Sequence, residues 1–266
     1  MIVGVIRQRT VKDAIAEIKN GEKRGARGFD LHLDALDEEF RTVESIQQIC
    51  EATERPILAL NYKNGYFGPL TMTEEERIEL LMVAVDAGVS AVDLQGYSFD
   101  DTAKLEFVDA EHVPEELEFL KELKPNEVAL KPEVLEKQRR FIEKVHEKGA
   151  EVLLSMHLGV HLTTDQLLAL SQFVRRTRNM DAIKLVTPCA SEQQLAECLY
   201  STVILKQQLD FPFVYHAAGK MGMKSRMICP MLGSYMMFCN VDYGYSSNFE
   251  QLHLESMAEA YRLMDV

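Results

Sequence analysis

The stretch D-A-I-K-L-V-T at 181–187 has the pattern of a short buried strand, and a lysine stands in its middle. Arg178 and Asn179 precede the stretch and Pro188 follows it, which bounds the strand on both sides. A lysine is rarely buried without a task or a partner, because desolvating an ammonium ion is costly. Lys184 is therefore either an amine for imine formation or a lysine whose stem lies along the sheet with its head in water.

Seven further apolar runs of strand length occur along the chain, and helical patterns follow them. They lie at 2–6, 29–33, 56–60, 91–94, 151–155, 213–215 and 235–239. Eight strands, each followed by helical material, predict an α/β protein with a (β/α)8 TIM barrel fold, in which residues 1–266 form a single domain. An open doubly wound sheet is the alternative, but no G-x-G-x-x-G follows the first strand to favour it.

The segment 96–131 interrupts this pattern after the fourth strand. It is too long for an ordinary connection, so we expect an extended insertion with its own helix at 114–123. Because it leaves the carboxyl end of a barrel strand, it is expected on the catalytic face. There it covers the pocket, builds a subunit contact, or is a solvated excursion without a catalytic role.

Composition narrows the classes of partner. The formal charge of -13 argues against nucleic acid and anionic membrane surfaces, since both require basic patches. No apolar run approaches the length of a membrane span, and the first residues lack the order of a signal peptide. The five cysteines show no C-x-x-C spacing, which favours reduced thiols in a cytoplasmic protein.

Polar residues repeatedly stand within or directly after the predicted strands, toward the end where barrel enzymes place their chemistry. They are Asp30, His32, Asp34, Asn61, Tyr62, Lys63, Asp93, Gln95, His157, Lys184 and His216. Lys184 and His157 belong to adjacent strands. An amine turns a ketone into an iminium electron sink, and a neighbouring histidine can take the acidified proton and return one to a leaving hydroxyl.

Four motifs in order carry a resemblance to the type I 3-dehydroquinate dehydratase family. V-L-L-S-M-H at 152–157 resembles the family's strand ending in Ser-x-His, and D-A-I-K-L-V at 181–186 resembles its Schiff-base strand. M-G-M-K-S-R at 221–226 with L-G-S at 232–234 is similar to Gly-x-x-Ser-Arg followed by Gly-Ser. A-V-D-L-Q at 91–95 is the weaker counterpart of Val-Asp-x-Glu.

The resemblance implies roles for individual residues. Lys184 would be the imine-forming lysine, His157 the general acid and base, and Arg226 the guanidinium that holds the substrate carboxylate. Asp93 could orient the imidazole. The implied reaction is a hydro-lyase step, 3-dehydroquinate to 3-dehydroshikimate by syn elimination in the shikimate pathway of aromatic amino acid biosynthesis or in quinate breakdown. It implies no metal and no organic cofactor, a small carboxylated ketone as substrate, and is compatible with a homodimer.

The departures from the family fall on substrate recognition. Asp30 and His32 stand where the family has Glu-x-Arg, and Tyr62 replaces an arginine at the end of the third strand. The family loop after strand eight appears as Y-S-S-N-F-E-Q at 245–251, with Phe249 at the position of its glutamine. The predicted substrate-binding residues are Arg226, Asp30, His32, Tyr62, Asp93, His216 and Ser246.

Two alternatives remain open at this point. A Schiff-base lyase or aldolase acting on another carboxylated ketone would keep the chemical groups and change the recognising ones. A non-catalytic relative that binds a small acid is the other alternative, although a binding protein has no need for an amine and an imidazole beside an arginine.

Overall fold

The computed structural model describes residues 1–63, 72–100, 107, 109–245 and 247–264. The chain divides into two compact units. The first contains Met1–Asp93, Val145–Glu151 and Met236–Val266, and the second contains Leu94–Lys144 and Val152–Tyr235. The single domain of 1–266 with an insertion at 96–131 stays a prediction.

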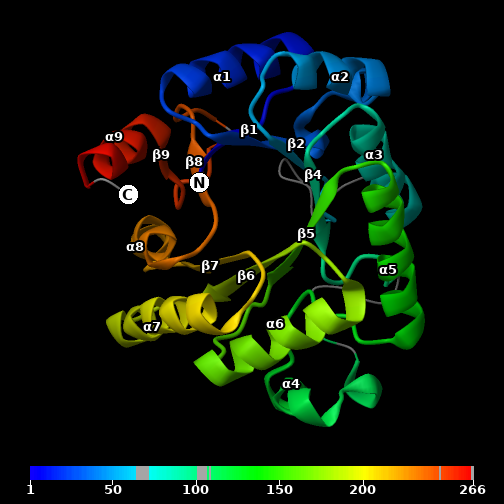
Figure 1. Ribbon diagram of the computed structural model, residues 1–266, viewed down its shortest axis with the longest axis vertical. Coiled ribbons are helices and arrows are strands. Elements are labelled where there is room, and N and C mark those ends of the chain that lie inside the picture. The colour runs from blue at the N-terminus through cyan, green and yellow to red at the C-terminus, as the bar shows by residue number, and fades with distance from the viewer. Residues whose placement is uncertain (64–71, 101–106, 108, 246, 265–266) are drawn as a thin grey trace. The chain divides into compact units, whose positions relative to one another are not determined.

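The first unit is built on parallel strands that pair in the order β4-β3-β2-β1-β8-β9. Helices α1 and α2 lie along β1 and β2 (Figure 1). The strands are β1 (Ile2–Ile6), β2 (Gly28–His32), β3 (Ile57–Leu60), the first part of β4 (Ala91–Gln95), β8 (Met237–Asn240) and β9 (Leu252–His253). The helices are α1 (Val11–Lys23), η1 (Leu33–Ala35), η2 (Glu38–Phe40), α2 (Val43–Glu51), α3 (Glu74–Asp86) and α9 (Leu254–Met264).

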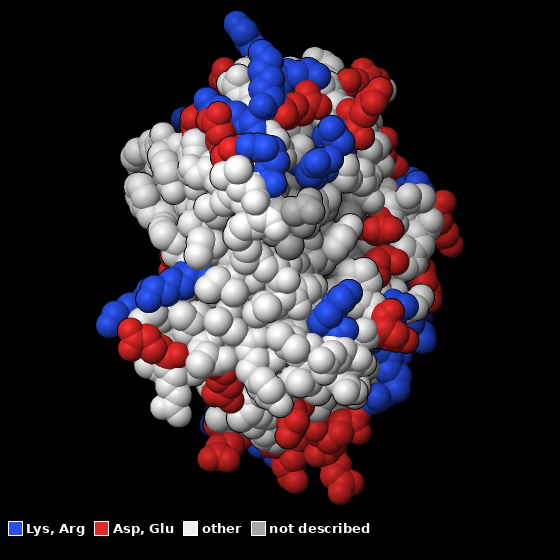
Figure 2. Space-filling model, turned by 60° about the vertical axis from the view of Figure 1, so that its left-hand side comes forward, with Lys and Arg blue, Asp and Glu red and all other residues white. Residues whose placement is uncertain are grey.

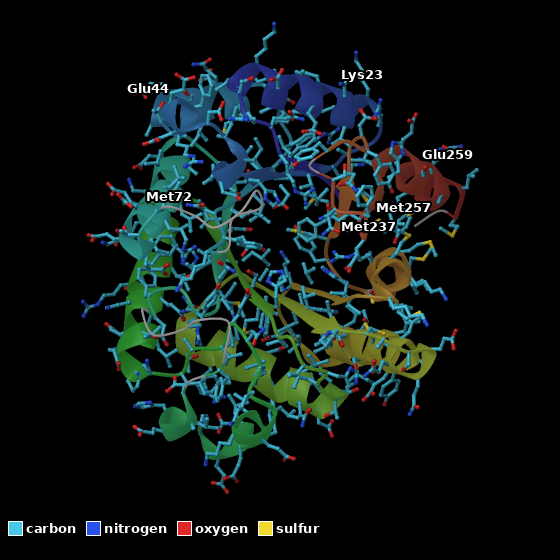
Figure 3. The ribbon with its side chains drawn as sticks, turned by 180° about the vertical axis from the view of Figure 1, so that it is seen from behind. Lys23, Glu44, Met72, Met237, Met257 and Glu259 are labelled. Atoms are coloured by element: carbon cyan, nitrogen blue, oxygen red, sulfur yellow. The ribbon has the colours of Figure 1, made fainter. Side chains whose placement is uncertain are left out.

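Side chains before the helices of this unit fix where each one begins. Thr10 and Thr42 each accept a hydrogen bond from a backbone N–H of the first turn, and Thr73 forms a reciprocal capping box with Glu76. The helices then bury one face and expose the other, as the outward Lys23 shows in Figure 3.

The second unit has parallel strands in the order β4-β5-β6-β7, with α6 and α7 packed along β5 to β7 (Figure 1). Its strands are the end of β4, β5 (Glu151–His157, from Val152 on), β6 (Ala182–Pro188) and β7 (Phe213–Ala218). Its helices are η3 (Ala110–His112), η4 (Glu115–Leu117), α4 (Phe119–Leu123), α5 (Pro132–Glu147, up to Lys144), α6 (Thr164–Arg178), α7 (Glu192–Gln208), α8 (Gly222–Ile228) and η5 (Cys229–Leu232).

Several elements differ in extent from their predicted ranges. β5 runs to His157 and β7 to Ala218, because backbone pairing continues into the polar residues that were expected to follow the strands. The helix predicted at 114–123 is divided into η4 and α4, and residues 101–106 and 108 of the same segment lie outside the described residues. The short strand β9 precedes the closing helix α9.

A buried guanidinium holds the second unit together next to the segment after β4. Arg178 is 1% exposed. Its Nε donates to Gln138 Oε1 at 2.7 Å and its Nη2 to the carbonyl of Ala129 at 2.5 Å. The amide of Gln138 in turn donates to the carbonyls of Gly96 and Ser98, each at 3.0 Å. Burial lowers the pKa of Arg178 to about 9, which leaves the group charged at neutral pH.

The surface carries charges of both signs, and they mix on the face shown in Figure 2. Within the residues that the structure describes, no helix combines the length and the apolar character that crossing a membrane requires.

Removing the buried guanidinium should destabilise the protein. We expect Arg178→Ala to lower the free energy of unfolding by about 3 kcal/mol, because the oxygens of Gln138 and Ala129 lose a charged donor in the interior. Arg176→Ala is the matched control on the same helix, since the Arg176 side chain is 61% exposed, and it should cost less than about 0.5 kcal/mol. Urea denaturation measures the free energy of unfolding of both variants. Equal decreases in the two would contradict a stabilising role for the buried Arg178.

Candidate active site

The register of β5, β6 and β7 places three of the predicted site residues on one face of the second unit's sheet. Lys184 lies on β6, and two residues further on Val186 pairs with His157 of β5 and with His216 of β7. Paired residues of parallel strands share a face, and residues two apart along a strand share it too. Lys184 is therefore flanked by two imidazoles, each one pleat closer to the carboxyl end.

Burial and charge show that these groups lie close together. Lys184 is 6% exposed and His216 is 4% exposed. Burial first, and then the charges of Arg226, Lys184 and His157, hold the pKa of His216 well below its ordinary value. His216 is thus a neutral imidazole close to basic groups, able to donate one hydrogen bond and accept another.

His157 is oriented by a carboxylate from the segment after β4. Its Nδ1 lies 2.9 Å from Glu127 Oε2, and its backbone N–H donates to the same oxygen at 2.8 Å. A proton on Nδ1, donated to this carboxylate, leaves Nε2 as the basic nitrogen. The imidazole is half-buried, so Nε2 can meet a ligand.

Arg226 is positioned by the short helix α8. Ser225 anchors this helix to the end of β7, because its hydroxyl accepts from the backbone N–H of Ala217 and donates to the carbonyl of Gly222, both at 2.8 Å. The two residues of the Ser-Arg pair in the motif at 221–226 therefore act differently. The serine fixes the position of the helix, and the arginine carries the positive charge.

Other predicted site residues lie in the first unit. On β2, His32 Nε2 is 3.8 Å from Asp30 Oδ2, and its Nδ1 is 3.6 Å from Asp34 Oδ1. The hydroxyl of Tyr62 donates to Asp93 Oδ2 at 2.7 Å. All of these side chains except Tyr62 are buried.

The structure brings Lys184, His157, His216 and Arg226 together in the second unit. In that unit it is Glu127 whose carboxylate contacts the His157 ring, whereas the orienting role of Asp93 stays a prediction. Ser246 lies outside the described residues, as do Tyr66, Phe67 and Gly68 of the segment that follows Tyr62.

Sequence reasoning missed Glu127 and Arg7, which are both buried and charged. Glu127 gave no signal, because it is one of many acidic residues in the segment 96–131. Arg7 did give a signal in the sequence, since it directly follows an apolar strand. Arg7 Nη2 donates to Gln251 Oε1 at 2.9 Å. Gln251 is 7% exposed and Phe249 is 73% exposed, so the buried glutamine of this loop is residue 251.

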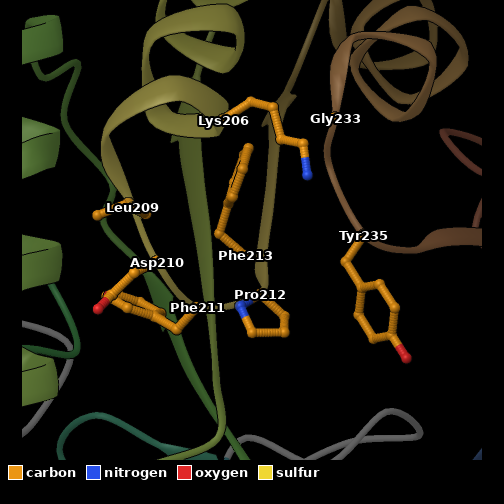
Figure 4. A pocket seen from close by; sticks show the side chains of 8 residues that line it. All are labelled: Lys206, Leu209, Asp210, Phe211, Pro212, Phe213, Gly233 and Tyr235. Carbon is orange, nitrogen blue, oxygen red and sulfur yellow. The ribbon is translucent and has the colours of Figure 1, made fainter.

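A cavity of about 320 Å³ lies at the opposite end of β7 (Figure 4). Phe213 lines it, with its ring directed toward the Lys206 side chain. Val214, the next residue, pairs with Lys184, so Phe213 points to the other face of the sheet. The cavity is therefore separate from the lysine and its two histidines. In the described part of the chain, no three His, Cys, Asp or Glu side chains are grouped as metal ligands.

Parallel strands alternating with helices, and a buried amine between imidazoles near the strands' carboxyl ends, define an α/β enzyme of the Schiff-base class. The family model for type I 3-dehydroquinase matches residues 2–266. The chain belongs to this family, whose members are hydro-lyases that use an imine-forming lysine.

Individual relatives agree with this assignment. The 3-dehydroquinate dehydratase of Dehalococcoides mccartyi strain CBDB1 is 26% identical over 91% of this chain and 87% of its own length. The 3-dehydroquinate dehydratase structure from Geobacillus kaustophilus covers 100% of this chain and 92% of its own at a TM-score of 0.72 and 16% identity. The type I enzyme from Clostridium difficile covers 99% and 91% at a TM-score of 0.74 and 16% identity. The predicted family, its hydro-lyase class and the (β/α)8 TIM barrel fold are thereby confirmed.

The neutral state of His216 predicts a pH dependence of stability. The unfolded chain binds this proton near pH 6.5 and the folded chain does not, so the free energy of unfolding falls as the pH drops below that value. One proton contributes at most about 1.4 kcal/mol per pH unit. We expect His216→Gln to show a shallower acid loss than wild type in urea denaturation between about pH 7 and about pH 5.

Val214→Ala is the control for this measurement, because it alters the same strand and face without a titrating group. It should lower stability at every pH and keep the wild-type slope. The same slope in His216→Gln and wild type would mean that the pKa of His216 is the same in the folded and the unfolded chain.

Proposed function

We propose that this chain dehydrates 3-dehydroquinate to 3-dehydroshikimate by syn elimination, with Lys184 as the imine-forming amine and His157 as the general acid and base. The observation that carries the proposal is the placement of the buried Lys184 on the same sheet face as His157 and His216, one pleat from each. Family membership supplies the substrate class.

The residues account for each step of the reaction. The Lys184 amine attacks the ketone, and loss of water from the carbinolamine gives an iminium ion that acidifies the neighbouring C–H bond. His157 Nε2 takes that proton and then donates one to the departing hydroxyl. Water hydrolyses the imine and frees the amine. The balance is the loss of one water from the substrate, with no cofactor required.

Arg226 and His216 are proposed to bind the substrate around this centre. A guanidinium matches a carboxylate with two parallel hydrogen bonds, which suits Arg226 to the acid group of the ketone. The neutral His216 can hydrogen-bond a hydroxyl or the carbinolamine oxygen. Asp30, His32, Tyr62, Asp93 and Ser246 stay predictions as substrate-binding residues.

A second candidate is a Schiff-base lyase or aldolase acting on another carboxylated ketone. His32 and Tyr62, where the family motif has arginines, favour it, because recognition groups change when a substrate changes.

For compartment and assembly, we propose a cytoplasmic homodimer. Its five cysteines are all free, which suits a reducing compartment. On α8, Met223 and Met227 stand one turn apart and are 44% and 38% exposed, an apolar surface of the kind that subunit contacts cover. Sedimentation analysis distinguishes a dimer from a monomer. The small ketone is the proposed partner, and nucleic-acid binding is not expected.

Borohydride trapping tests the imine. With 3-dehydroquinate and sodium borohydride, wild type should gain mass and Lys184→Ala should not, because reduction of the iminium gives a stable secondary amine. Lys206→Ala, an exposed lysine on α7, should still form the adduct. Intact-protein mass and the absorbance of the conjugated product measure adduct and turnover.

Each result of that experiment points to one function. An adduct with turnover supports dehydroquinate as substrate. If neither an adduct nor turnover is seen, dehydroquinate is rejected as the substrate. The same trapping experiment is then run with a panel of other keto acids. No adduct across the panel would instead indicate a protein that binds a small acid without catalysis.

Arg226→Lys tests the carboxylate clamp. We expect KM to rise roughly tenfold or more while kcat changes less, because a lysine keeps the charge and loses the bidentate geometry. Lys224→Ala, on the same helix, should leave KM near the wild-type value. Steady-state kinetics measure both parameters, and an unchanged KM in Arg226→Lys would remove Arg226 from substrate binding.

A further inference from the structure

The carboxylate of Glu127 is held at both oxygens between two strand ends of the second unit. Oε2 accepts from the backbone N–H and lies 2.9 Å from Nδ1 of His157. Oε1 accepts from the amide of Gln95, the last residue of β4, at 3.1 Å. Glu127 is 8% exposed and Gln95 is 1% exposed. The carboxylate thus has a fixed orientation toward the imidazole.

The backbone around Glu127 is shaped to make this contact. Glu127 has φ of 58°, the left-handed region that costs a non-glycine residue about 1–3 kcal/mol. Its carbonyl passes so close to Gly96 that a Cβ there would lie 2.4 Å from the oxygen. The preceding residue, Asn126, donates its backbone N–H to the carbonyl of Leu158 at 2.8 Å. Strain at a fixed acid is a sign of function rather than of packing alone.

Buried polar contacts on the following residues keep this conformation in place. The backbone N–H of Leu130 donates to Asp109 Oδ2 at 2.6 Å. The carbonyl of Ala129 accepts from Arg178, and Gln138 links Arg178 to the carbonyl of Gly96. The two chain segments that approach each other, at 96 and at 127–130, are therefore tied to the same two side chains.

Chemically, a carboxylate on Nδ1 does two things for a histidine that works through Nε2. It fixes the tautomer, so that Nε2 carries the lone pair. It also stabilises the imidazolium that forms when Nε2 takes a proton from the substrate. Gln95 cannot supply the negative charge, since its amide is neutral, but its N–H₂ group keeps the carboxylate of Glu127 in position.

We propose that Glu127 is the positioning residue of the elimination step, and that the segment 96–131 thereby supplies part of the catalytic apparatus. The inference rests on the proposed function of His157 as the proton-transferring group. Gln95 donates a hydrogen bond to the second oxygen of Glu127. Glu127 therefore supplies the carboxylate, and Gln95 holds that carboxylate in place.

Glu127→Gln and the exchange Gln95→Glu with Glu127→Gln test the proposal. Glu127→Gln should lower kcat about 10²-fold or more with KM changed less than about threefold, because proton transfer weakens while ketone binding persists. The exchange returns a carboxylate to the same pair and should recover at least about tenfold of the lost kcat. Glu122→Gln, an exposed residue of α4 in the same segment, is the control and should match wild type.

Two further measurements separate positioning from structure. Nitrogen NMR of the His157 ring should show the Nδ1–H tautomer in wild type and a mixture of tautomers in Glu127→Ala. Borohydride trapping should still give the Lys184 adduct in Glu127→Gln, because imine formation does not require this carboxylate.

The outcomes separate this inference from the proposed function. If wild type forms no adduct, the proposed function fails, and the NMR tautomer still reports on Glu127. If wild type is active and Glu127→Gln keeps kcat within about threefold, Glu127 is not a positioning residue. An unchanged tautomer in Glu127→Ala, or an exchange variant no faster than Glu127→Gln, overturns the inference as well.

Discussion

The in-register pairing of β5, β6 and β7 is the constraint on which the active site depends. It sets Lys184 one pleat below two imidazoles and keeps all three on one face without any contact between their side chains being required. A slip of one residue in β6 would turn Lys184 to the other face and disassemble the site. Val186, which pairs with both histidines, is consequently as much a part of the geometry as the candidate site residues themselves.

The chemistry also depends on a second layer of fixed polar groups. A buried cation or carboxylate is tolerated only with partners, and here the partners are backbone carbonyls, amides and one strained glutamate. Arg178 donates a hydrogen bond to the backbone carbonyl of Ala129, and Gln138 donates to those of Gly96 and Ser98. The same contacts therefore contribute to the stability of this unit and to the orientation of the His157 ring.

The three residues of the candidate site on the sheet of the second unit could be predicted from the sequence, because they obey a local rule. Period-two alternation and the position of polar residues at strand ends are enough to pick out Lys184, His157 and His216. Glu127 obeys no such rule. Its place is decided by a left-handed backbone angle and by the absence of a side chain at Gly96, which are tertiary facts. The same holds for Gln251, which meets Arg7 from far along the chain, whereas loop similarity pointed to Phe249.

The cations gathered around His216 sit in a protein whose formal charge is -13. At low ionic strength the net charge repels an anionic ketone, whereas in physiological salt charges more than about 8 Å away are largely screened and the local cations dominate its approach. Salt would have opposite effects on the two stages of encounter. Salt would speed the approach of the ketone by screening the acidic surface. It would weaken the final ion pairs only a little, because buried pairs are screened less than exposed ones.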